Sequence, residues 1–187
     1  AAARHLAAIL PRCIAVVADA EGELAAALAQ EGLQVITNPR AGEGMGTSIA
    51  CGVAASPEAG GWVIALADMP CIPESIIQAV VAGLDQGADI IAPVYQGRRG
   101  HPVGFSARHA PALLQLHGDA GARSIIAANR ASLELVESSD AGIIIDRPTR
   151  YIGSHECFYD HLIDIERLAE ALDEVYHDPQ WRQTLAA

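Results

Sequence analysis

The stretch Trp62-Val63-Ile64-Ala65-Leu66-Ala67-Asp68-Met69-Pro70 decides the fold expected for this chain. Its five apolar residues from Trp62 to Leu66 cover both alternating faces, which is typical of the central strand of a parallel sheet, buried on both sides. Pro70 has no N–H and cannot continue the ladder. Asp68 is therefore expected at the carboxyl end of a buried strand, where open α/β sheets bind ligands. A lone Asp in this place is also typical of a helix cap.

Strands and helices alternate along the rest of the chain. The expected strands cover residues 13–18, 34–37, 62–66, 89–94, 133–136 and 142–145, and the expected helices cover residues 1–10, 21–30, 48–55, 73–84, 106–116, 118–129 and 162–176. This order predicts an α/β fold, with a Rossmann-like, mostly parallel sheet and helices on both faces.

Length and charge limit the class of protein. The 187 residues suit one domain, 1–187, with a sizeable core. A formal net charge of −11 argues against a nucleic-acid or anionic-membrane partner, and no apolar run is long enough to span a bilayer. The four cysteines, Cys13, Cys51, Cys71 and Cys157, form no CxxC pair. We therefore expect reduced thiols and a cytoplasmic protein.

A glycine-rich loop, Gly42 to Ser48, follows one expected strand and opens a helix. Its amides and the helix N-terminus could hold an anion. The dinucleotide pattern G-x-G-x-x-G fails because Thr47 takes the place of the third glycine, so an NAD-type enzyme ranks last among the readings. A plain glycine turn with Ser48 as N-cap explains the loop equally well.

Three other features carry side chains suited to phosphate chemistry. Asp146 ends the apolar stretch 142–145, as Asp68 ends its own, and two carboxylates at strand ends could clamp Mg²⁺. His101 stands between Gly100 and Pro102 in a loop or hairpin over 98–105 and is expected to be exposed there. Arg123 closes the segment 118–123, where it could pair with a phosphate. For each, an ordinary structural role is an open alternative.

Together these loops resemble the MobA-like nucleotidyltransferase family, and most closely its molybdenum cofactor cytidylyltransferases. The matching pieces are N-P-R-A-G-E-G-M-G-T-S-I at 38–49, A-L-A-D-M-P at 65–70, G-H-P-V-G-F at 100–105 and G-D-A-G-A-R at 118–123. Each motif alone is weak, but all four in this order are specific. They cover roughly residues 10–146.

The resemblance implies a fold of the nucleotide-diphospho-sugar transferase type and Mg²⁺-dependent transfer of a nucleotide to a molybdopterin-type acceptor. Asp68 would be a catalytic ligand of Mg²⁺, and Asp146 the second, with Asp164 as the alternative candidate. The form A-D-M-P favours CTP over GTP as the donor. Residues along the nucleotide would be Asn38, Gly44 and Ser48; residues at the acceptor pocket would be Gly100, His101 and Pro102, with Arg123 at a phosphate.

Two departures from the family pattern shape these expectations. The family begins with a strand and a triphosphate loop of the type L-A-A-G-x-x-x-R-x-G-x-x-K, which these residues do not contain, so the N-terminal strand is expected to be missing. Residues 147–187 form an atypical C-terminal segment, with a helix expected at about 162–176. The segment could dock a partner such as a molybdoenzyme. An alternative function is therefore a non-catalytic, pterin- or nucleotide-binding accessory protein of molybdoenzyme maturation.

Overall fold

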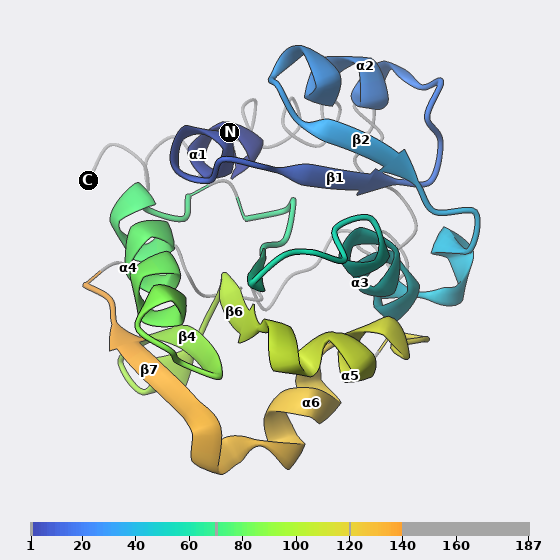
Figure 1. Cartoon of the computed structure of the whole chain (residues 1–187). Helices are drawn as coiled ribbons and strands as arrows, with labels where there is room; N and C mark the ends of the chain where they lie inside the picture. Colours follow the sequence, from blue (N-terminus) through green and yellow to red (C-terminus); the bar gives the residue numbers. More distant parts are fainter. Residues whose placement is uncertain (1, 70, 120, 140–187) are drawn as a thin grey trace, which may run out of the picture.

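The computed structural model describes residues 2–69, 71–119 and 121–139 (Figure 1). These residues form helices and strands in alternation, as expected of an α/β protein. The helices are α1 (Ala2–Ile9), α2 (Glu23–Gln30), α3 (Met45–Ala54), α4 (Glu74–Asp85), α5 (Ala110–Leu114) and α6 (Arg123–Ala128). The strands are β1 (Ile14–Val17), β2 (Gln34–Thr37), β3 (Gly61–Ile64), β4 (Ile90–Tyr95), β5 (Arg98–Arg99), β6 (Val103–Ser106) and β7 (Leu133–Glu137). Short 3₁₀ turns cover Ala41–Glu43, Ala107–His109 and Arg130–Ser132.

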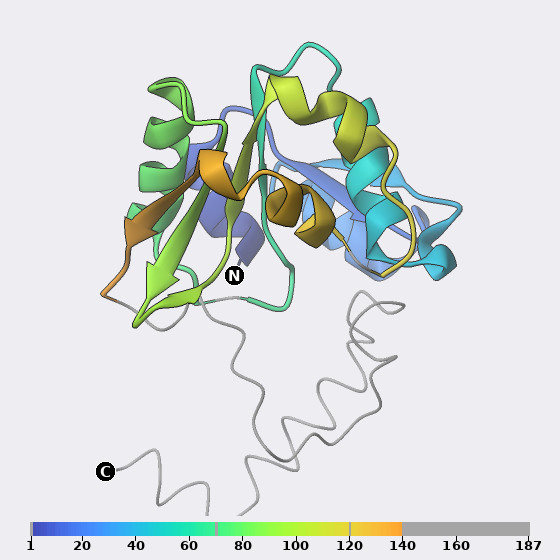
Figure 2. The same cartoon turned by 90° about the horizontal axis from the view of Figure 1, so that it is seen from below.

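The strands are divided between two sheets. Strands β1 and β2 pair in parallel and form a sheet of their own, whereas β3, β6, β4 and β5 follow one another in a larger sheet, with β7 on the other edge of β4. Figures 1 and 2 both show the β1–β2 sheet apart from the larger one. Strand β4 is thus the centre of the larger sheet, and it is buried along most of its length.

Strand β3 differs from its prediction. It pairs with β6 alone among the described strands, and the pairing is antiparallel, with Ile64 opposite Val103. All four of its residues are only partly buried. The predicted parallel direction is therefore wrong for this strand. In the larger sheet only β4 and β7 are parallel, so that sheet is mixed rather than mostly parallel.

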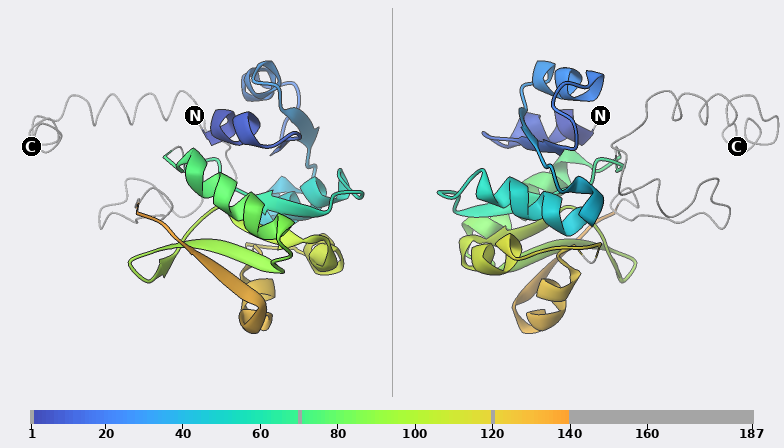
Figure 3. Two further views of the ribbon diagram at one scale, coloured as in Figure 1. Left: turned by 60° about the vertical axis from the view of Figure 1, so that its left-hand side comes forward. Right: turned by 90° about the vertical axis from the view of Figure 1, so that its right-hand side faces the viewer.

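Helices cover both faces of the larger sheet, as predicted. On one face, Ile90 and Ala92 pack with residues of α3, α5 and α6. On the other face, Ile91 packs with Val80 of α4. Figure 3 shows α4 and α6 on opposite sides of the sheet. The apolar pattern of β4 therefore reflects burial on two faces.

A third apolar cluster anchors the segment that follows β3. Met69, Ile72 and Ile77 are buried, and Leu6, Ile9 and Leu66 pack against them. The segment that carries Asp68 is thereby held between α1 and the start of α4. This anchor positions the candidate site.

Most expected elements appear within a few residues of their predicted bounds. Strand β2 has the predicted bounds, and Gly32 follows α2 with a φ of 84°, which suits a helix C-terminus. Helix α3 begins at Met45, with Gly44 as its N-cap, so Ser48 lies inside the helix and is not the cap. The predicted strand at 142–145, the helix at 162–176, and both Asp146 and Asp164 lie outside the described residues.

The described residues bear on two expectations, reduced cysteines and the absence of a membrane-spanning segment. In the described part of the chain, Cys13, Cys51 and Cys71 are free thiols. None of the helices described there has the length and apolar character needed to cross a membrane.

Candidate functional site

Asp68 lies beyond the end of β3, in the turn before α4. Its side chain is exposed, while its neighbour Met69 is buried in the apolar cluster with α1. Atoms packed around the carboxylate remove part of its water, and this desolvation raises the pKa of Asp68 above its usual value. No ion pair joins Asp68 to a basic side chain of the described residues. The carboxylate is thus partly desolvated and has no cationic partner there.

The donor set around Asp68 suits a cation that also binds phosphate oxygens. Within the described residues, no group of three or more His, Cys, Asp or Glu side chains gathers to hold a metal ion. Mg²⁺ commonly uses one or two carboxylates and completes its shell with water and substrate phosphates. Asp68 fits that requirement as one ligand. The predicted second ligand, Asp146 or Asp164, falls outside the described part of the chain.

His101 reaches the end of β3 through the pairing of β6 with that strand. Because Ile64 lies opposite Val103, His101 stands beside the chain that leaves β3 toward Asp68. Burial, and after it the charges of Arg99 and Arg123, lower the pKa of His101 to about 4, although the Ile64 carbonyl opposes them. Its Nδ1 is buried and has no hydrogen-bond partner. The expectation of an exposed His101 is wrong: the imidazole is half-buried, and at neutral pH it is uncharged.

The residues on either side fix the His101 loop. Gly100 is buried, and its N–H donates to the carbonyl of Pro93 at 2.8 Å. Pro102 is fully buried, and the His101–Pro102 peptide bond is cis. The hairpin expected over 98–105 is confirmed, since β4 pairs with both β5 and β6.

The buried side chain of Asn38 forms hydrogen bonds with residues of the glycine-rich loop and of α3. It is 4% exposed, and its Nδ2 donates to Thr47 Oγ1 at 2.9 Å and to Ser48 Oγ at 3.0 Å. Its Oδ1 accepts from the N–H of Arg40 at 3.0 Å. These bonds tie the end of β2 to the first turns of α3. The sequence analysis missed this structural role, although a buried amide after a strand needs such partners.

Gly44 lets the glycine-rich loop lie directly against the 117–121 segment. Its φ is 110°, and a Cβ there would stand 2.5 Å from the carbonyl carbon of Gly118 and 2.7 Å from its oxygen. The N–H of Gly46 donates to the Gly118 carbonyl at 2.8 Å, and a Cβ on Gly46 would stand 2.7 Å from the His117 nitrogen. Two motifs that are far apart in the sequence are therefore packed main chain against main chain.

Packing and charge relate the four motif segments to one another. The glycine-rich loop packs on Gly118, and helix α6 begins at Arg123 just beyond it. The charge of Arg123 acts on His101, which lies beside the chain leading to Asp68. The structure thus packs Gly44 next to the segment that carries Arg123, and the charge of Arg123 is near enough to lower the pKa of His101. Asn38 lies just before, and Ser48 at the end of, the glycine-rich loop that packs on Gly118.

Several solved structures have a fold similar to that of this chain. The Rv0371c protein of Mycobacterium tuberculosis H37Rv, solved in complex with manganese, is 24% identical, with a TM-score of 0.58 over 69% of each chain. A homologue from Mycobacterium sp. strain JC1 is 23% identical, with a TM-score of 0.57 over 92% of this chain and 83% of that one. A Methanothermobacter nucleotidyl transferase, Mth528, is 20% identical, with a TM-score of 0.60 over 73% of this chain and 67% of that one. The fold is that of a nucleotidyl transferase.

The family follows from the sequence match. The model of the MobA-like NTP transferase domain matches residues 1–134, so the chain belongs to that family. Among curated proteins no match was found.

Proposed function

We propose that this protein is a Mg²⁺-dependent nucleotidyltransferase that moves CMP from CTP to the phosphate of a molybdopterin-type acceptor, with pyrophosphate as the leaving group. One observation carries the proposal: the Asp68 carboxylate is partly desolvated, its pKa is raised, and it has no cationic partner among the described residues. A divalent cation bound next to Asp68 would favour the ionised carboxylate and so offset the effect of its desolvation. Family membership supports the reaction class.

The chemistry asks little more of the protein than alignment and charge. Nucleotidyl transfer needs the reacting phosphates held in line and their negative charge neutralised. Bound Mg²⁺ would supply the neutralisation, with Asp68 as one ligand and Asp146 or Asp164 as the second. The manganese bound by the mycobacterial protein of similar fold supports a divalent cation.

The remaining residues take roles in the two substrate sites. Asn38, Gly44 and Ser48 would line the nucleotide, although the Asn38 side chain is already hydrogen-bonded within its loop. Gly100, His101 and Pro102 would border the acceptor. The sequence A-D-M-P at 67–70 supports CTP as donor. The enzyme would act in the cytoplasm, with a molybdoenzyme as a further partner.

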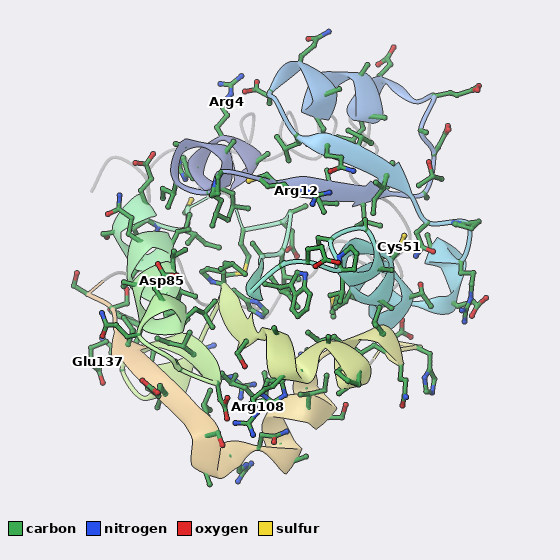
Figure 4. The ribbon with its side chains drawn as sticks, viewed as in Figure 1. Arg4, Arg12, Cys51, Asp85, Arg108 and Glu137 are labelled. Atoms are coloured by element: carbon green, nitrogen blue, oxygen red, sulfur yellow. The ribbon has the colours of Figure 1, made fainter. Side chains whose placement is uncertain are left out.

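Calorimetric titration with CTP and GTP, with and without Mg²⁺, tests this proposal. We expect Mg²⁺-dependent CTP binding that weakens by at least about tenfold in Asp68→Asn, since a metal ligand is lost without a change of volume. Asp85→Asn is the matched control, because Asp85 is exposed at the end of α4 (Figure 4) and should leave binding within twofold. Equal CTP binding by Asp68→Asn and the parent would refute the assignment.

A second candidate is binding without turnover. Among the described residues no group of three or more His, Cys, Asp or Glu side chains could hold a metal ion, and binding alone does not require one. An assay of pyrophosphate release under the conditions of CTP binding separates the two functions. Release that depends on Asp68 supports the enzyme, and binding with no release supports the accessory protein.

A further inference from the structure

Six arginines of the described residues differ in whether a carboxylate lies against them. Three of them lie against carboxylates: Arg4 with Glu31, Arg40 with Glu43, and Arg108 with Asp89. Figure 4 shows Arg4 and Arg108 on opposite sides of the molecule. Arg99, Arg123 and Arg130 form no ion pair with any described acid. In a chain with a net charge of −11, three unpaired cations near one another need an explanation.

The sheet register places Arg99 on the face that α6 covers. Arg99 lies directly opposite Val94 across the β4–β5 pair, so the two side chains share a face. Val94 is on the same face of β4 as Ile90 and Ala92, which pack against Ile125 and Ile126 of α6. Arg123 begins α6, and Arg130 begins the turn that follows it.

Electrostatic effects agree with this placement. The pKa of Arg99 is lowered, first by burial and then by the charges of Arg123 and Arg130. Arg99 and Arg123 also act on His101, and no carboxylate of the described residues acts on either Arg99 or His101. The nearest acid in the register is Glu137, which lies across the central strand, beside Val94 on the far side from Arg99. The cationic cluster therefore lacks a protein counter-ion among the described residues.

We propose that Arg99, Arg123 and Arg130 form a phosphate-binding subsite beside His101. Guanidinium groups bind phosphate oxygens through paired N–H donors, and several of them together suit a dianion. All three side chains are exposed, so a ligand can reach them. His101, which lies beside the chain that leads to Asp68, carries no positive charge at neutral pH. The positive charge of the subsite therefore comes from the arginines, and it is suited to an anionic group.

The source of the phosphate rests on the proposed function. It is either the phosphate of the acceptor or part of the triphosphate of the nucleotide, and both present the same chemistry. The position of the arginines at the His101 loop favours the acceptor. The probes are therefore chosen to separate the two sources and to work without turnover.

The test uses the whole chain and a pair of double variants with equal loss of charge. Arg99→Gln with Arg123→Gln removes two members of the cluster. Arg4→Gln with Arg12→Gln removes two exposed arginines from the α1–β1 side of the molecule (Figure 4). Inorganic phosphate, pyrophosphate and CTP with Mg²⁺ are titrated into each protein at constant ionic strength.

We expect phosphate binding to weaken by at least about tenfold in the cluster variant, which is the loss of one charge-assisted hydrogen bond or more. The control variant should bind within twofold of the parent. Equal weakening in both variants, or none in the cluster variant, would overturn the proposal. If CTP binding is unchanged in the cluster variant, the subsite belongs to the acceptor; if it falls with phosphate binding, the subsite belongs to the nucleotide.

NMR titration of His101 gives a second measurement, the pKa of His101, which does not depend on measuring how tightly a ligand binds. In the cluster variant, loss of two nearby positive charges should raise the pKa of His101 above about 4, and phosphate should raise it in the parent. An unchanged His101 pKa in the folded variant would overturn the clustering itself. A parent that binds phosphate through these arginines but binds no CTP would retain this inference while the proposed function fails.

Discussion

Asp68 and His101 are governed by the same physical effect with opposite consequences for their pKa values. Burial removes water from both side chains and so disfavours the charged form of each, which raises the pKa of Asp68 and lowers that of His101. Both residues stand beside the chain that leaves β3. A region that disfavours isolated charge in this way would favour a bound pair of opposite charges, such as a cation with a phosphate.

The His101 environment predicts a specific dependence of stability on pH. Its folded pKa of about 4 lies below the ordinary value of 6.5. The unfolded chain therefore takes up the proton first as the pH falls from 6.5 toward 4, which lowers the free energy of unfolding over that window. We expect His101→Asn to flatten the fall in the free energy of unfolding across this window by on the order of 2 kcal/mol, allowing for partial exposure. Urea denaturation between pH 7 and pH 4 measures it.

His117→Asn serves as the control for this experiment, because the His117 side chain is exposed. The free energy of unfolding of His117→Asn at pH 7 should stay within about 0.5 kcal/mol of that of the parent. A His101→Asn variant whose pH dependence runs parallel to that of the parent would contradict the buried, uncharged state of His101.

At the scale of elements, sequence patterns predicted the bounds of helices and strands better than they predicted which strands pair and in which direction. Strand β2 was predicted with its observed bounds because a short segment between Gly32 and Asn38-Pro39 has clear ends. The direction of β3 was wrong because an apolar run shows burial on two faces but does not show which way the neighbouring strand runs. The glycines at 44 and 46 indicated close packing, yet nothing in their own loop indicated that the partner is Gly118.

The packing of these loops predicts unequal effects of two adjacent glycine substitutions. Gly44→Ala should lower the free energy of unfolding by about 1–3 kcal/mol or more, because it combines a positive φ with overlap of main-chain atoms. Gly42→Ala is the control, since nothing lies within 4 Å of a Cβ at that position. Chemical denaturation of both variants measures the difference, and equal stabilities would contradict the observed contact.

At the scale of the whole molecule, the two sheets differ in how well they are buried. Strand β4 is buried over five consecutive residues, whereas β2 has no buried residue and β1 has one. The alternation of elements predicted the α/β class but could not predict this division, because periodicity does not record which strands pair. Asp146 and Asp164, the alternatives for the second metal ligand, stay predictions because they lie outside the described residues.

This difference in burial predicts two levels of local stability. Amide hydrogens of β1 and β2 should exchange with solvent at a lower opening free energy than those of β4, because fewer apolar contacts oppose their opening. Native-state hydrogen exchange followed by NMR or mass spectrometry measures both. Uniform protection across β1, β2 and β4 would show that the two sheets open as one unit.

The contact between the two glycine loops also bears on how the sequence can diverge. A side chain at Gly44 or Gly46 would meet main-chain atoms of residues 117–118, which cannot turn aside as the end of a flexible side chain can. A larger residue in one loop therefore requires the backbone of the other loop to shift. Related proteins should consequently keep the two motifs together or replace them together, and an engineer who alters the nucleotide loop must redesign both.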